Sequence, residues 1–239
     1  MLLAALVVAL AGCGGSARHT ASTVAATATA PATTAPATAA PADPGKVLVD
    51  SFAAAARKGD ARALWAMLST ESRSRLGPDF SRFSQKAAHG FYRDLGAFTS
   101  FRTIVSERIT PEFGVVAIDG IRNGKRAVYA IPLRLQGEQW KVESGGPVVV
   151  RPIGPAPGSK GQVVAQVAGA VEGPGGTGTA VMYLDGATLN PEVRGTASNS
   201  TLFANFDQAL DPGRHTVVLF ANDGREAAAT AWAFTAAKR

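Results

Sequence analysis

The sequence has little of the side-chain chemistry that metal sites and thiol enzymes need. Its 239 residues contain one cysteine, Cys13, and three histidines, His19, His89 and His215, which lie in three different segments. A single cysteine excludes a disulfide within the chain, so the folded parts depend on their apolar cores. The spacing of these four residues assembles no ligand cluster. We therefore predict neither a metal site nor a bound cofactor.

The sequence also lacks an apolar run long enough to cross a membrane. The only continuous run at the N-terminus spans Leu2–Leu10, whereas a membrane-spanning helix needs roughly 20 residues. A run of this length is typical of the central part of a signal peptide. An ordinary signal peptide has a Lys or Arg before this apolar run. None precedes the run here, so the true translation start stays open.

Leu10, Ala11 and Gly12 stand directly before the only cysteine of the chain. This order resembles the lipobox of bacterial lipoproteins, in which the signal peptide is cut before the cysteine and the sulfur carries a diacylglycerol. The resemblance implies that residues 1–12 are a lipoprotein signal peptide and that Cys13 is lipidated, with palmitate among its acyl chains. It places the protein on the extracytoplasmic face of the bacterial cell membrane. The alternative is an incidental or buried thiol.

The segment after the anchor is biased in composition. From Ala17 to Pro44 it consists almost wholly of Ala, Thr, Pro and Ser, with no aromatic residue. Such a segment cannot bury enough apolar surface to offset the entropy lost on ordering. We predict a disordered tether over residues 13–45, whose Thr and Pro content would suit O-glycosylation.

Residues 46–152 show a helical apolar pattern that changes to an alternating one. Gly59 and Asp60 separate two predicted helices, and Pro78 opens a third that extends to Leu95. Asn123-Gly124 predicts a type I′ hairpin between strands. In the strand that follows, Arg126 and Arg134 lie on the face opposite the apolar residues, which predicts one core face and one wet face. The predicted strands are 101–109, 113–119, 126–135 and 139–142.

Three helices followed by a bent antiparallel sheet resemble the NTF2-like fold. The segment from Asp50-Ser51-Phe52 through Gly59-Asp60 to Leu64–Leu68 is similar to the start of NTF2-like domains in bacterial lipoproteins, and Gly137–Val142 is similar to their last strand. The resemblance implies an α+β cone over residues 46–152 that encloses a cavity. His89, Tyr92, Asp94 and Tyr129 are candidates to line that cavity. The alternative is that the tyrosines are ordinary core-edge aromatics, and that His89 and Asp94 do not share a helix face.

Residues 153–161 are rich in Pro and Gly and are predicted to be a linker. The short alternating segments over residues 162–236 predict a small all-β sandwich. Leu210–Val217, Asp223-Gly224 and Ala231–Thr235 resemble the closing strands of bacterial Ig-like surface modules. The resemblance implies a second, Ig-like domain with a role in adhesion or spacing.

Charge is distributed unevenly between the two predicted domains. Residues 46–152 hold 17 Lys and Arg against 10 Asp and Glu, whereas residues 153–239 hold 6 against 7. A basic domain near a membrane would be attracted to anionic lipids or wall polymers. The alternative is a solvated basic surface without a dedicated partner. No basic motif interleaved with aromatic residues indicates nucleic acid.

Sequence motifs of catalysis are missing as well. There is no Gly-x-Ser-x-Gly elbow, and no Ser stands three residues before a Lys. We therefore expect no catalytic residues and a non-enzymatic, lipid-anchored envelope protein that serves as an interaction or ligand-sensing module. Its partner would be an envelope protein or an anionic wall polymer. Two alternatives stay open: a cavity that binds a small apolar ligand, and an isomerase- or dehydratase-like enzyme that uses the same cavity.

Overall fold

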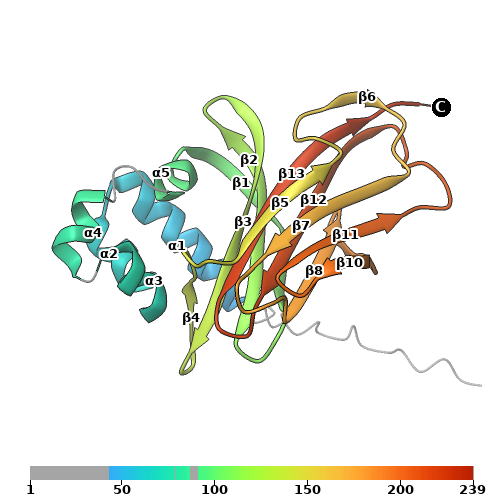
Figure 1. The fold of residues 1–239 in the computed structure, drawn as a ribbon. Coiled ribbons are helices and arrows are strands. Elements are labelled where there is room, and N and C mark those ends of the chain that lie inside the picture. The colour runs from blue at the N-terminus through green and yellow to red at the C-terminus, as the bar shows by residue number, and fades with distance from the viewer. Residues whose placement is uncertain (1–42, 78, 87–90, 239) are drawn as a thin grey trace, which may run out of the picture. The chain divides into compact units, whose positions relative to one another are not determined.

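The computed structural model describes residues 43–77, 79–86 and 91–238, which belong to one compact unit. Five helices come first, and thirteen strands in three sheets follow (Figure 1). The helices are α1 (Pro44–Lys58), α2 (Ala61–Met67), α3 (Thr70–Leu76), α4 (Phe80–Lys86) and α5 (Phe91–Gly96). None of the helices in these ranges has the length and hydropathy that a membrane span requires.

The strands fall into a first, a central and an outer sheet. The first sheet is the antiparallel meander β1 (Phe98–Arg108), β2 (Phe113–Arg122), β3 (Lys125–Gln136) and β4 (Gln139–Val142). The outer sheet has the order β10 (Glu192–Thr196), β11 (Asn199–Asn205), β7 (Gln166–Glu172) and β5 (Val149–Gly154). The central sheet has the order β6 (Lys160–Gln162), β13 (Ala227–Ala236), β12 (Gly213–Asn222), β8 (Thr179–Leu184) and β9 (Ala187–Thr188).

The first two helices form where the sequence predicts them, because their ends are set by local chemistry. The Asp43 carboxylate accepts hydrogen bonds from two backbone N–H groups at the start of α1. Gly59 ends α1 in the left-handed region, at φ 66°. The Asp60 carboxylate then caps α2 by accepting from the Ala63 N–H at 2.9 Å.

The prediction of one long helix over residues 78–95 is wrong for the described part of that range, which forms the separate helices α4 and α5. Residues 78 and 87–90 lie outside the described residues. A further helix, α3, was not predicted. Ser69 caps it by accepting from the Ser72 N–H at 3.0 Å, and Gly77 follows its end.

Three apolar cores separate four layers. The helix core lies between the helices and the first sheet, and includes Phe52, Phe83 and Ile131. The interface core lies between the first and central sheets, and includes Phe113 and Phe220. The sandwich core lies between the central and outer sheets. Its buried members are Val148, Val164, Val167, Val171, Met182, Leu202, Ala204, Val217, Leu219, Ala221, Trp232, Phe234 and Ala236.

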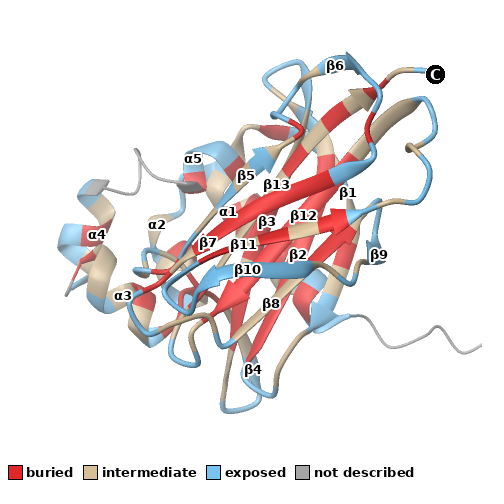
Figure 2. Cartoon of the chain, turned by 45° about the vertical axis from the view of Figure 1, so that its right-hand side comes forward, coloured by how far each residue is buried: buried red, intermediate tan, exposed pale blue. Residues whose placement is uncertain are grey.

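The predicted NTF2-like cone with a separate Ig-like sandwich is wrong as a fold class. The chain is 50% strand and 21% helix, its helices are short, and no cone of helices on a bent sheet is present among the described residues. The physical reason is that the first sheet is buried on both faces: Phe113, Val115 and Ala117 pack toward the central sheet instead of facing water. Figure 2 shows the resulting long buried stretches along β2 and β12.

Candidate functional site

The residues that the sequence nominated do not share one cavity within the described part of the chain. Cys13 and His89 lie outside the described residues. Tyr92 is 3% exposed and packs on Phe83 with ring centroids 5.4 Å apart. It lines a small pocket of about 210 Å³ among the helices. Tyr129 belongs to a different pocket, of about 160 Å³, between β3 and β13.

The structure brings Asp94 and Tyr129 into electrostatic contact, but not around a substrate site. Burial raises the pKa of the Tyr129 hydroxyl to about 12, and the negative charge of Asp94 adds to the shift. Burial alone raises the pKa of Tyr92 to about 12. Asp94 is exposed and forms an ion pair with Arg122 at 3.4 Å. Both hydroxyls therefore stay protonated at neutral pH, and neither is poised as a base.

Two buried carboxylates bracket the interface core instead. The Asp119 side chain, 3% exposed, accepts two hydrogen bonds from Arg126 and two from Arg214. Burial alone would raise the pKa of Asp119, but these hydrogen bonds and the positive charges of both arginines hold it below its usual value. Because Arg214 comes from β12 and Asp119 from β2, the cluster joins the first and central sheets.

Glu143 forms the second cluster, at the other end of the interface. Its fully buried carboxylate accepts from Arg134 Nε at 3.2 Å and lies 3.6 Å from Arg75 Nη1. Arg75 also pairs with Glu226, and Arg134 donates to the Arg225 carbonyl. At Arg134 the face of β3 that was predicted to be wet is therefore buried against the C-terminal strands, whereas Arg126, near the start of β3, is 55% exposed and stays at the surface.

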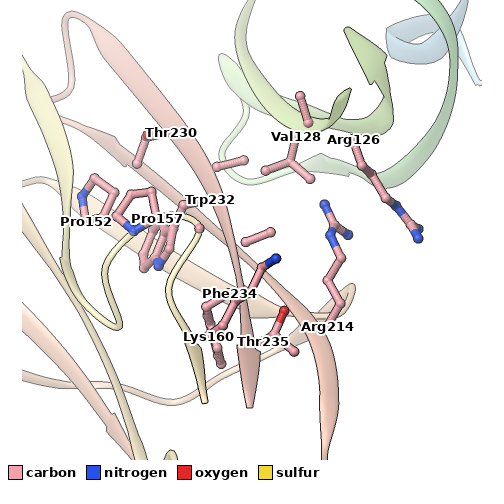
Figure 3. A pocket seen from close by; sticks show the side chains of 14 residues that line it. Arg126, Val128, Pro152, Pro157, Lys160, Arg214, Thr230, Trp232, Phe234 and Thr235 are labelled. Atoms are coloured by element: carbon pink, nitrogen blue, oxygen red, sulfur yellow. The ribbon is translucent and has the colours of Figure 1, made fainter. Parts of the chain in front are cut away.

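A basic groove of about 740 Å³ opens beside the Asp119 cluster, where β3, β13 and the β5–β6 connection meet. Figure 3 shows Pro152, Pro157 and Trp232 on one side of this groove and Arg126 and Arg214 on the other. Lys160 lies at the same groove, and no carboxylate within the described residues pairs with it. The apolar wall and the cationic wall thus face each other across an open space.

No Asp, Glu, His, Cys or Ser is present among the described residues that line the groove. In the same ranges, no group of His, Cys, Asp and Glu could hold a metal ion. The lining combines cations, threonines and apolar side chains. Such a surface can bind an anionic ligand with apolar parts.

Sequence reasoning missed this groove because its walls come from distant segments. Arg126 and Arg214 are 88 positions apart, and only the stacking of the central sheet on the first sheet brings them together. One signal was present: Phe113–Ile118 and Val217–Ala221 are apolar runs without alternation. Such runs are typical of strands buried on both faces.

Comparisons with known proteins add no family. No family model and no curated protein matches the chain. Among solved structures, the chain is similar to the endo-β-1,4-mannanase from Thermotoga petrophila, with 10% sequence identity and a TM-score of 0.32. The match covers 38% of this chain and 20% of the mannanase, so the chain spans about a fifth of that protein. A similarity of this size carries no argument about fold or activity.

Proposed function

We propose that the chain is a non-enzymatic, lipid-anchored protein of the bacterial cell envelope that binds a partner through its stacked sheets. The anchor part of the proposal rests on Leu10-Ala11-Gly12-Cys13. Two acyl chains on a cysteine suffice for stable attachment, since each buried methylene contributes about 0.8 kcal/mol. The bulk of the folded residues then lies outside the membrane, where a partner can reach it.

The observation that carries the binding role is the basic groove. It combines open space and apolar side chains with Arg126, Arg214 and Lys160, of which Lys160 has no described partner. No Asp, Glu, His, Cys or Ser is present among its described lining residues. The helix core, where an enzyme or carrier of the alternative kind would hold its ligand, is filled by side chains that include Phe52, Phe83 and Leu95. Binding at the groove therefore agrees with the geometry better than chemistry in a cavity.

Metabolic labelling tests the anchor. Cells that express the full-length protein are fed an alkyne analogue of palmitate, and the purified protein is assayed for the label. The wild type should carry the label and sediment with membranes, and Cys13→Ser should do neither. Unlabelled wild-type protein would refute the lipoprotein assignment.

Crosslinking in intact cells tests the binding role. A photoreactive amino acid at position 160, in the groove, should form a discrete adduct with an envelope component, and the same amino acid at position 58, at the exposed end of α1, should not. Equal adduct patterns at both positions, or none at position 160, would contradict a partner at the groove.

A further inference from the structure

The edge of β13 that faces the groove is open over several residues. Gly158 N donates to the Ala233 carbonyl and Thr235 N donates to the Ser159 carbonyl. These bonds show that odd-numbered residues of β13 direct their backbone groups away from β12. Ala229 and Ala231 share this direction, and no described residue hydrogen-bonds with their outward N–H and C=O groups. The central sheet thus presents a short free edge.

Both ends of this free edge are closed by the chain itself. β6 pairs with β13 at Thr235 and Ala236. At the other end, the segment between β4 and β5 passes from the first sheet to the outer sheet, and Gly145, Gly146 and Val148 line the pocket beside Ala227. The free edge between these ends comprises Ala229 and Ala231.

One wall of the groove is cationic and the other is apolar, which suits an extended chain whose alternate side chains differ in polarity. Successive side chains of a strand point to opposite sides. Ala231 lines the groove and Ala229 lines the adjoining pocket, so a strand added to this edge would extend from that pocket into the groove. In the groove, Arg126 and Arg214 lie on one wall, and Pro152 and Pro157 lie on the other.

Charge decides which kind of peptide fits. Asp119 is the carboxylate that faces Arg102, Arg126 and Arg214, and Lys160 adds a further cation without a described partner. The excess positive charge favours acidic side chains on the arginine side. The opposite wall favours apolar ones.

We infer that the groove binds an extended acidic segment of an envelope protein, with alternating acidic and apolar residues, which adds as a strand to the free edge of β13. The inference rests on the proposed function and names the chemistry of its partner. An anionic wall polymer would satisfy the cations, but it has no main-chain donors and acceptors to match Ala229 and Ala231. A polypeptide matches both features.

Fluorescence anisotropy with the full-length protein in detergent tests the inference. The probe is a fluorescein-labelled peptide of alternating Glu and Val, and the controls are the same peptide with Lys in place of Glu and a version that is N-methylated at alternate residues. We expect the Glu peptide to bind, the Lys peptide not to bind, and N-methylation of the edge-facing residues to weaken binding roughly tenfold or more, since each lost hydrogen bond removes about one order of magnitude in affinity.

Matched variants place the site. Lys160→Glu should weaken binding of the Glu peptide roughly tenfold because it reverses a groove charge, whereas Lys58→Glu, on exposed α1, should leave it unchanged. Ala231→Pro removes an outward N–H and leaves the bonds to β12 in place, because Ala231 faces away from that strand. It should abolish binding, with an unchanged circular dichroism spectrum as the check on folding.

Several results would overturn the inference. Equal binding of the N-methylated and unmodified peptides, with competition by inorganic polyphosphate, would show that the groove recognises polyanions without strand addition. Absence of binding by every probe would reject an acidic peptide ligand. Neither result would affect palmitate labelling or the adduct at position 160, so failure of the inference and failure of the proposed function are distinguishable.

Discussion

Strand β12 is buried on both faces, and its adjacent residues Leu219 and Phe220 point to opposite faces. Both side chains are fully buried, but Leu219 belongs to the sandwich core and Phe220 to the interface core. The sandwich core contains large side chains such as Trp232 and Phe234. Opposite Phe220, β13 contributes the small residues Ala227, Ala229 and Ala231, and buried ion pairs close both ends.

The difference separates a folding core from a docking surface. Every buried member of the sandwich core comes from residues 148–236, whereas the interface core joins residues 105–130 to residues 183–227. Buried ion pairs contribute little net stability, but a misaligned docking would leave them unpaired at a large cost. The apolar contacts therefore hold the layers together, and the Asp119 and Glu143 clusters set how they align.

The largest expected effect comes from Phe220→Ala. Loss of a buried phenyl ring costs about 3–5 kcal/mol, and here it weakens only the contact between the first and central sheets. We expect urea unfolding followed by Trp fluorescence and by far-UV circular dichroism to give two transitions that no longer coincide. Leu219→Ala, on the other face, should cost about 2–5 kcal/mol and keep coincident curves. Coincident curves for Phe220→Ala would contradict the distinction between the two cores.

A smaller effect is expected from Asp119→Asn, because the amide keeps the shape of the side chain but removes acceptor capacity. Asp119 accepts four hydrogen bonds from Arg126 and Arg214, whereas Glu143 accepts one from Arg134. We expect Asp119→Asn to lower the free energy of unfolding by about 2 kcal/mol and Glu143→Gln by about 1 kcal/mol. Urea unfolding at pH 7 measures both, and the reverse order would show that Glu143 is the stronger alignment point.

Acid unfolding should depend on the same carboxylate. Because the pKa of Asp119 is lower in the folded state, its contribution is present above the unfolded value, about 3.9, and is lost as the pH falls through the folded pKa. The difference in stability between wild type and Asp119→Asn should therefore narrow below pH 4. A constant difference from pH 7 to pH 2, measured by urea unfolding, would contradict this assignment.

The smallest effect concerns His215, a charge contact that lies within the C-terminal strands. Its Nδ1 hydrogen-bonds with Asp185 at 2.7 Å and its Nε2 with the Asp211 carbonyl at 2.7 Å. Burial lowers the pKa of His215, but the hydrogen bonds and negative charges of these two partners raise it by a larger amount, so the net pKa lies above the ordinary value. The contribution is complete below the unfolded pKa, about 6.5, and is lost as the pH rises through the folded pKa.

We expect the wild type to exceed His215→Gln in stability by less than about 1 kcal/mol at pH 5.5, since Asp185 is largely exposed. The gap should close by pH 8.5. Thermal unfolding at both pH values measures it. An equal gap at both pH values would show that the imidazole acts through packing on Phe234 rather than through charge.

Local features of the fold could be predicted from the sequence. Asp43 was not predicted as a cap, but Gly59 and Asp60 delimit the first helices as expected, and Asn123 and Gly124 adopt the positive φ values, 49° and 74°, of the predicted hairpin. The four strands of the first sheet are within three residues of their predicted ends. These features depend on a few neighbouring residues, and short-range chemistry decides them.

The stacking of layers could not be predicted in the same way. Nothing near Arg126 indicates that Arg214 will share its carboxylate, because that contact depends on how two sheets pack. The family resemblance assigned the second face of the first sheet to a cavity or to solvent. The unbroken apolar run Phe113–Ile118 is typical of a strand that is buried on both faces, and it indicates a further layer on the second face of the first sheet.

The position of the central sheet also sets an order for biogenesis. Its two long strands, β12 and β13, are synthesised after the other strands of the described residues, yet they belong to the central sheet of the stack. Until they emerge, the nascent chain exposes Phe113, Val115 and Ala130 on one side and the inner face of the outer sheet on the other. A stop codon or proteolytic cut before Gly213 would therefore leave two exposed apolar surfaces, one from each core. Quality-control proteases would degrade such a product, because it cannot form a shortened but folded protein.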